Sequence, residues 1–199
     1  MKYSIAAAIV TVVGFASPAI ASAVTFTNNC GFPVYYSKAW HGGEDFQVYD
    51  IGPHGGEGYE EIVEPPVGGV ARGAVIKFHK GDGLTSGILQ FEYTKEYDNA
   101  KRVKGIYWNF SHVDGDSPGV PGVSPFHDVG VMAIPLGTGR DVGTCTDIHC
   151  EAGEECKGSF LFDLDNIKVK HCSLELASFE VEFCPINNGA HKRGLEFSA

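Results

Sequence analysis

The chain has 199 residues, enough for one domain with a sizeable buried core. Its 26 glycines and 10 prolines, with only 20% charged residues, are typical of many short strands joined by turns and argue against a helical bundle. The net charge of -10 opposes binding to nucleic-acid phosphates or to an anionic membrane surface, so neither is expected as a main partner.

The first 23 residues have the pattern of a secretory signal peptide. Lys2 precedes an apolar stretch over residues 5–15, and the segment ends on the small residues Ala21, Ser22 and Ala23. The apolar stretch is too short to span a bilayer comfortably, and no later run reaches the roughly 20 apolar residues of a transmembrane helix. The sequence therefore predicts a signal peptide over 1–23 and one secreted domain over 24–199, without membrane insertion.

Alternation of polar and apolar residues with a period of two predicts strands buried on one face. In chain order the predicted strands are 24–27, 34–39, 74–79, 89–93, 106–110, 129–134, 160–164, 167–171 and 178–183, and the alternation is clearest in 24–27, 89–93, 106–110 and 178–183. No segment keeps a helical period beyond about three turns. The predicted fold class is all-β.

Glycine- and proline-rich segments at residues 52–58, 65–69 and 114–125 separate the strands and predict loops. The last of these is long enough for a binding loop, and an irregular surface crossover is the alternative.

Six cysteines in a secreted chain predict three disulfides, in any of 15 connectivities. They are Cys30, Cys145, Cys150, Cys156, Cys172 and Cys184. The eight histidines show no paired ligand spacing, so the sequence predicts no metal site, and no cofactor is expected.

Both ends of the predicted mature chain resemble those of thaumatin-like proteins. The opening is VTFTNNCGFPV over residues 24–34, and the closing strand is FEVEFCP over residues 179–185. The motifs GVAR at 69–72, LQF at 89–91 and YWNFSHVDG at 107–115, with the cysteine block 145–172, follow in the order of that family. The chain is similar to the small secreted thaumatin-like proteins of filamentous fungi, a group that includes the Blastomyces yeast-phase-specific protein. The resemblance implies a thaumatin-like β-sandwich with three disulfides.

The resemblance also implies which cysteines pair: Cys30 with Cys184, Cys145 with Cys172, and Cys150 with Cys156. Longer members of the family carry a helical, disulfide-rich second domain between the positions that match Cys150 and Cys156. Only five residues, 151–155, stand there in this chain. We therefore expect the second domain to be absent.

In plant relatives an acidic cleft between the two domains binds β-1,3-glucan, and some of these proteins are reported to hydrolyse it. The arginine of that cleft matches Arg72, and two of its aspartates match Asp114 and Asp165. Two further carboxylates are replaced by the amides Gln90 and Asn109, which have no carboxyl proton to transfer. Because a glycosidase needs two carboxyl groups flanking the scissile bond, the resemblance implies glucan binding without catalytic residues. A purely structural role is the alternative for Asp114, which opens a turn, and for Asp165, which precedes a loop.

Two further positions are candidate sites. Asn109, Phe110 and Ser111 form an N-glycosylation sequon, and the alternation predicts that Asn109 lies on the exposed side of its strand. Trp40 lies at the end of a predicted strand and is the candidate for an exposed platform on which a sugar ring stacks, whereas Trp108 is predicted to be a core residue.

These observations predict an extracellular or cell-wall-associated fungal protein. Its expected role is to bind or help remodel cell-wall polysaccharide, β-1,3-glucan above all, during growth or germination. One alternative is a weak endo-β-1,3-glucanase, which would need a carboxylate pair such as Asp114 and Asp165. The other is a secreted antigen or host-interaction protein that contacts a host surface protein.

Overall fold

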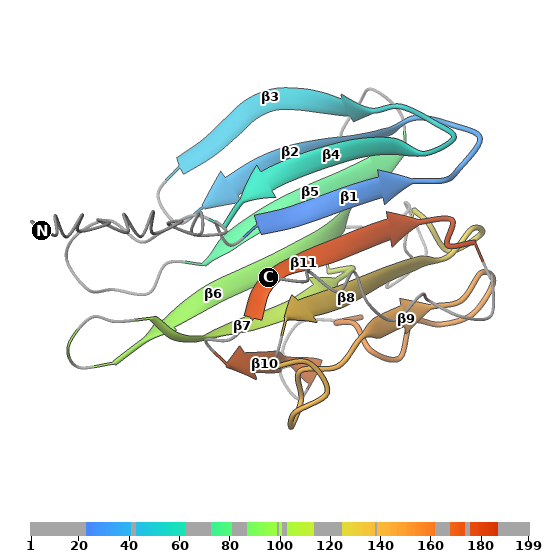
Figure 1. Cartoon of the computed structure of the whole chain (residues 1–199). Coiled ribbons are helices and arrows are strands. Elements are labelled where there is room, and N and C mark those ends of the chain that lie inside the picture. The colour runs from blue at the N-terminus through green and yellow to red at the C-terminus, as the bar shows by residue number, and fades with distance from the viewer. Residues whose placement is uncertain are drawn as a thin grey trace, which may run out of the picture.

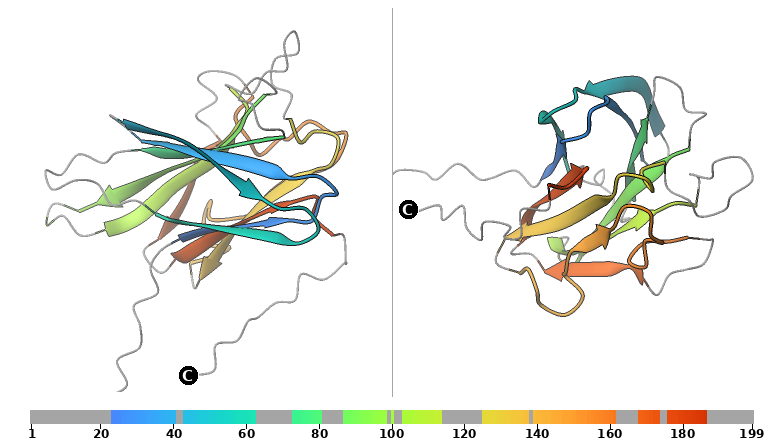
Figure 2. Two further views of the ribbon diagram at one scale, coloured as in Figure 1. Left: turned by 90° about the horizontal axis from the view of Figure 1, so that it is seen from above. Right: turned by 90° about the vertical axis from the view of Figure 1, so that its right-hand side faces the viewer.

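The computed structural model describes residues 23–40, 43–62, 73–80, 87–98, 100, 103–113, 125–137, 139–161, 168–173 and 176–186. Eleven strands and no α-helix form in these residues, so the prediction of an all-β fold is confirmed. The strands make two sheets that stack as layers (Figures 1 and 2).

The first sheet has five strands in the order β4-β1-β11-β8-β9. Their bounds are β1 (Ala23–Asn28), β4 (Gly56–Glu61), β8 (Val131–Gly137), β9 (Ile148–Cys150) and β11 (Leu176–Phe183). The pairing of β1 with β11 is parallel and the other pairings are antiparallel. The first and last strands of the chain therefore lie side by side in the middle of this sheet (Figure 1).

The second sheet has six strands in the order β10-β7-β6-β5-β2-β3, all antiparallel. Their bounds are β2 (Val34–Trp40), β3 (Gly43–Ile51), β5 (Ala74–Lys80), β6 (Leu89–Tyr97), β7 (Val103–Ser111) and β10 (Lys170–Ser173).

Aromatic side chains fill the space between the sheets. Phe179 of β11 lies 5.3 Å from Phe91 and 5.0 Å from Trp108, measured between ring centroids, and Phe183 lies 5.0 Å from Phe78. These side chains are fully buried, and each contributes about 1.5 to 3 kcal/mol through the removal of apolar surface from water. The period-two alternation that predicted the strands is the pattern that turns these rings inward.

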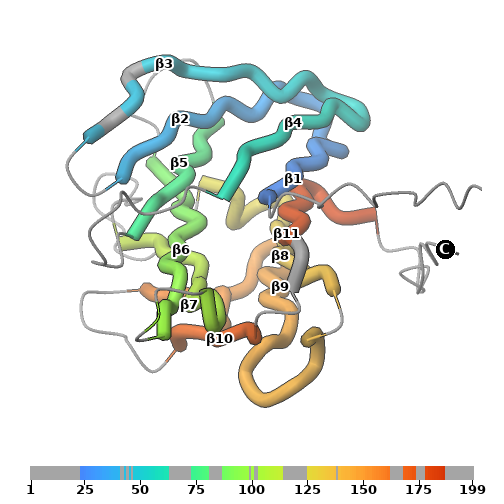
Figure 3. The backbone as a smooth tube through the Cα atoms, turned by 60° about the vertical axis from the view of Figure 1, so that its left-hand side comes forward, coloured from blue at the N-terminus to red at the C-terminus, as the bar shows by residue number. Residues whose placement is uncertain are grey.

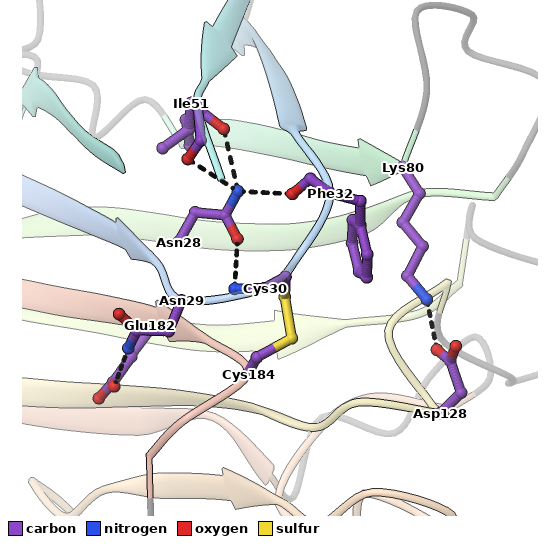
Figure 4. Close-up of a disulfide and its surroundings, with 10 residues drawn as sticks. Asn28, Asn29, Cys30, Phe32, Ile51, Lys80, Asp128, Glu182 and Cys184 are labelled. Atoms are coloured by element: carbon purple, nitrogen blue, oxygen red, sulfur yellow. Dashed lines mark hydrogen bonds and ion pairs between the residues drawn. A yellow bond between two sulfur atoms is a disulfide. The ribbon is translucent and has the colours of Figure 1, made fainter. Parts of the chain in front are cut away.

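Three disulfides join the six cysteines, and the pairs are those that the family resemblance implies: Cys30 with Cys184, Cys145 with Cys172, and Cys150 with Cys156. The first bond connects the segment after β1 to the residue after β11, across a sequence separation of 154 (Figure 4).

Buried Asn28 organises the backbone next to the first disulfide. Its Nδ2 donates to the carbonyl oxygens of Phe32, Ile51 and Gly52 at 2.9 to 3.0 Å, and its Oδ1 accepts a hydrogen bond from the backbone N–H of Cys30 (Figure 4). One side chain thereby fixes the start of β2 and the turn after β3 relative to the disulfide.

Strands β3, β4 and β9 were not predicted, and each lacks the period-two pattern for a physical reason. An irregularity between Tyr36 and Lys38 interrupts the pairing of β2 with β3. β4 is an edge strand rich in glutamate and glycine, and β9 has three residues. The prediction of a loop over 52–58 is wrong at its end, because the turn is complete at Gly55 and β4 begins at Gly56.

The predicted strand 160–164 is described only at its start. Phe160 forms an isolated bridge with Ser111, and residues 162–167 lie outside the described residues.

Candidate functional site

The outer face of the six-stranded sheet carries a row of polar side chains. Ser37, Lys77, Gln90 and Ser111 are successive register partners across β2, β5, β6 and β7. Gln90 and Ser111 are buried although they point away from the aromatic core. In the next row Glu92 is the register partner of Asn109, so Gln90 and Asn109 lie one row apart on the same face.

Asn109 is buried, and the prediction that it lies on the exposed side of its strand is wrong. Its side chain is 5% exposed, and Nδ2 donates to Glu92 Oε2 at 2.8 Å and to the carbonyl oxygen of Phe110 at 3.3 Å. Alternation assigned Asn109 correctly to the face opposite Trp108, but this polar face is itself packed. A glycan on Asn109 stays a prediction, and the nitrogen that would carry it is a hydrogen-bond donor in the folded protein.

Glu92 is a carboxylate of this face that the sequence analysis missed. It follows Gln90 by two residues on β6, so the strand period would have placed both on one side. Glu92 accepts a hydrogen bond from Asn109. A second carboxylate on the same face of β6, Glu96, lies four residues further along the strand and contacts His171.

Of the four predicted ligand-binding residues, the structure describes Trp40. Arg72, Asp114 and Asp165 lie outside the described residues, and their roles stay predictions. Arg72 stands two positions before Ala74 in the sequence. Ala74 is the first residue of β5 and lines the hollow described below.

Trp40 is the last residue of β2 and is 42% exposed, as a stacking platform requires. Its register partner across the sheet is Gly43, the first residue of β3. A Cβ atom at position 43 would lie 2.6 Å from the indole Nε1, so the ring packs directly over the glycine backbone. Glycine thus lets the indole lie close against β3, which holds the platform in place.

A hollow of about 50 Å³ opens beside the indole, between β4 of one sheet and β2 and β5 of the other. Figure 3 shows the course of the backbone through these three strands. It is lined by Lys38, Ala39, Trp40, Glu60, Glu61, Ala74, Val75, Ile76 and Tyr93. A water molecule needs about 10 to 15 Å³ of such space, so the hollow has room for a few small polar groups.

Glu60 connects the two sheets at this hollow. Its Oε1 accepts a hydrogen bond from the Tyr36 hydroxyl at 3.0 Å, and its Oε2 lies 2.9 Å from Lys38 Nζ. Lys38 Nζ also lies 4.0 Å from Asp45, which in turn accepts a hydrogen bond from the Tyr49 hydroxyl. The result is a half-buried polar network behind the exposed indole.

Burial and the charge of Glu60 raise the pKa of Tyr36, which keeps its hydroxyl protonated as a donor. The pKa of Lys38 lies above its ordinary value. Partial burial alone would lower this pKa, but the hydrogen bond to Glu60 and the charge of Glu60 raise it by more. Lys38 therefore stays charged and neutralises Glu60.

A buried serine–histidine pair lies elsewhere in the fold. His112 Nδ1 is 2.9 Å from Ser159 Oγ, and Ser159 Oγ donates to the carbonyl oxygen of Cys156. Both side chains are buried, so the hydroxyl has no access to a substrate. Desolvation lowers the pKa of His112 to about 4, with smaller contributions from Lys168 and His127. The pair acts as a neutral structural contact next to the Cys150–Cys156 disulfide.

No helix among the described residues has the length and apolar character to cross a membrane. No group of three or more His, Cys, Asp or Glu side chains in this part of the chain is arranged to hold a metal ion.

Two solved structures have a similar fold. The protein elicitor MoHrip2 from Magnaporthe oryzae matches with a TM-score of 0.56 at 19% identity, over 83% of this chain and 100% of its own. The thaumatin-like xylanase inhibitor TLXI matches with a TM-score of 0.49 at 13% identity, over 81% of this chain and 99% of its own. At these identities the first match supports the fold alone. A search of curated proteins found no match.

The sequence was also compared with models of protein families. The model described as Blastomyces yeast-phase-specific protein matches residues 11–185, which is most of the chain. With the sandwich and the three disulfides, this match confirms the thaumatin-like fold that the sequence resemblance implied. The chain belongs to the Blastomyces yeast-phase-specific protein family.

Proposed function

We propose that the protein is secreted and binds fungal cell-wall polysaccharide without hydrolysing it, with Trp40 as the principal contact. The observation that carries the proposal is the half-exposed indole held over Gly43 beside a hollow lined by charged side chains. Arg72, Asp114 and Asp165 are proposed to extend the site with hydrogen bonds to sugar hydroxyls.

The chemistry around Trp40 suits a sugar. An indole face offers apolar area to the C–H groups of a pyranose, while the neighbouring Lys38, Glu60 and Glu61 offer donors and acceptors to its hydroxyls. Each such hydrogen bond contributes on the order of 0.5 to 3 kcal/mol, so a single sugar binds weakly. Repeating sugars of a wall polymer raise the apparent affinity through avidity.

Two observations support binding without hydrolysis. Gln90 and Asn109 stand where the acidic cleft of plant relatives has carboxylates, and Glu92 is hydrogen-bonded to Asn109. A hydrolase needs two carboxyl groups at the distance that the retaining or inverting reaction requires, and Glu60 at the hollow is paired with Lys38. Three disulfides suit an oxidising extracellular environment.

The proposal is tested by pull-down of the purified protein on insoluble β-1,3-glucan, chitin and mannan. We expect retention on at least one polymer and loss of retention in Trp40→Ala. The matched control is Tyr107→Ala, because Tyr107 is also 42% exposed but lies on β7, away from the hollow. Equal retention of both variants would remove Trp40 from the site, and absence of retention on every polymer would overturn the function.

A reducing-sugar assay on the same polymers tests the second half of the proposal. We expect no release of reducing ends above that of a heat-denatured sample. Release that disappears in Asp114→Asn would establish the glucanase alternative.

A host-interaction role is the second candidate. The fold aligns with the full length of a protein named as an elicitor, which favours a secreted protein recognised by another organism. Application of the purified protein to plant leaf tissue, with the oxidative burst as readout, tests this role. If Trp40→Ala causes the same oxidative burst as the wild type, the host-interaction role does not depend on polysaccharide binding.

A further inference from the structure

We propose that the Cys145–Cys172 disulfide is a site of light-driven modification. When buried Trp108 is excited by ultraviolet light, it reduces this disulfide and leaves the other two intact. The site lies between β7 and β10, at one edge of the six-stranded sheet. Trp40 lies on β2 of the same sheet, with β5 and β6 in between, so the modification does not involve the polysaccharide site.

The indole of Trp108 is in direct contact with one sulfur of this disulfide. Its Nε1–H donates a hydrogen bond to Cys172 Sγ at 3.2 Å. Strands β7 and β10 are neighbours, and Lys170 of β10 is the register partner of Trp108. Cys172 lies two residues further along β10, so its side chain is on the same face of the sheet as the indole. The contact therefore follows from the pairing of the two strands.

The contact is shielded from water. Trp108 and Cys172 are fully buried, and Cys145 is buried as well. The rings of Phe91 and Phe179 lie 5.8 and 5.0 Å from the indole, measured between ring centroids, and keep it in place within the packed core. Because electron transfer falls off steeply with distance, a donor ring held against its acceptor sulfur is the most favourable arrangement for it.

The reaction needs only the groups that are in contact. An excited indole is a strong one-electron donor, and the antibonding orbital of an S–S bond accepts an electron. One electron moves from the ring of Trp108 to the disulfide, and the Nε1 proton follows along the hydrogen bond to Cys172 Sγ. The S–S bond then breaks. The products are a thiol at Cys172, a thiyl radical at Cys145 and a neutral indolyl radical at Trp108, so atoms and electrons balance without an external reductant.

The chain has two tryptophans, which makes the source of the electron easy to identify. Light at the red edge of the indole absorption band excites these two side chains and not the tyrosines. Trp40 is half exposed and packs over Gly43, whereas Trp108 is hydrogen-bonded to a disulfide. We therefore expect Cys145–Cys172 to open and the Cys30–Cys184 and Cys150–Cys156 bonds to stay closed.

The same electron transfer competes with fluorescence, so the emission of Trp108 should be quenched in the folded protein. Trp40→Phe retains Trp108 as its single indole and should emit weakly when folded. Unfolding this variant in urea separates the indole from the sulfur and should raise its emission.

The test irradiates the purified, disulfide-bonded protein at the red edge of the indole band in the presence of a nitrone spin trap, with a sample kept in the dark as control. Both samples are then unfolded with a maleimide at mildly acidic pH, where thiol–disulfide exchange is slow because few thiolates form. Peptide mapping should find the maleimide on Cys172 and the nitrone adduct on Cys145, both increasing with dose. The other four cysteines should stay at the level of the dark sample.

Two variants identify the donor. Trp40→Phe replaces an exposed side chain and should respond to light as the wild type does. Trp108→Phe should lower the labelling to that of the dark sample; because it also removes core volume, it is compared only if urea unfolds it cooperatively. Trp40→Phe decides the question on its own, since any response of this variant comes from Trp108.

Four results would overturn the inference. One is labelling of Trp40→Phe no higher than that of the dark sample, and another is label spread evenly over the three disulfides. The third is maleimide on Cys145 with the nitrone adduct on Cys172, which would contradict the transfer of the proton to Cys172. The last is folded Trp40→Phe that emits more strongly than the unfolded variant, which would show that the sulfur does not quench the indole.

Discussion

The buried His112 predicts a specific loss of stability in acid. Its pKa is about 4 in the folded protein, against 6.5 when exposed, because burial next to Ser159 disfavours the charged imidazolium. Between these two pH values the unfolded chain binds a proton that the folded chain excludes. The contribution of neutral His112 to the free energy of unfolding should therefore be complete above pH 6.5. This contribution should be lost as the pH drops toward 4.

The expected loss follows from the two pKa values. A difference of one unit corresponds to about 1.4 kcal/mol, so His112 should remove about 3 kcal/mol between pH 6.5 and pH 4. That is a large fraction of the roughly 5 to 15 kcal/mol by which a domain is stable.

The assay is urea unfolding of the wild type and of His112→Asn across this pH range. Carboxylates that titrate in the same range contribute equally to both proteins, so the difference between the two curves isolates the histidine. The variant is expected to be less stable at pH 7 but to lose less stability on acidification. Parallel curves would refute the reasoning, as would an NMR titration of His112 in the folded protein with a midpoint near 6.5.

Three further predictions concern the fold and the site. Cys30→Ser should lower the free energy of unfolding by about 4 to 5 kcal/mol in chemical denaturation, since the Cys30–Cys184 bond closes a very long loop. Cys150→Ser should cost less because its loop is short, and an equal loss in both variants would contradict this expectation. Phe179→Ala should cost about 3 to 5 kcal/mol, because the ring contacts Phe91 and Trp108 of the opposite sheet; a cost under 1 kcal/mol in the same assay would show that this ring is not central to the core. Gly43→Ala should displace the Trp40 indole and reduce retention on wall polymer in pull-down while the unfolding midpoint stays nearly unchanged; full retention would show that the position of the indole is unimportant.

Most of the fold could be predicted from the sequence, because the inward-facing positions of the strands are apolar, many of them aromatic, and alternate strictly with polar residues. Phe179, Val181 and Phe183 alternate with polar residues, and this segment became β11. β4 could not be predicted in the same way, because an edge strand pairs on one side only and its residues Gly56–Glu61 are alternately half-buried and exposed, without an apolar face. Its pairing with β1 depends on tertiary contacts that leave no periodic pattern.

The site was predictable only in part. The position of Trp40 at a strand end indicated its exposure, which the structure bears out. The contact of Trp40 with Gly43 joins the two strands of a hairpin, and the Lys38–Glu60 pair joins the two sheets. Neither contact follows from a local sequence pattern. Asn109 shows the opposite failure, because alternation gives the face of a residue but not whether that face is covered.

The central claim is that Trp40 contacts wall polysaccharide, and the indole N–H signals in a ¹⁵N–¹H NMR spectrum test it most directly. The chain has two tryptophans, so each signal can be assigned with one variant. Trp108 is buried and donates its Nε1–H to Cys172 Sγ, which makes it an internal control. On titration with wall oligosaccharides, namely glucosamine, N-acetylglucosamine and β-1,3-glucan hexamers, the Trp40 signal should shift with saturation while the Trp108 signal stays in place. A Trp40 signal that does not move with any of these sugars would contradict the account.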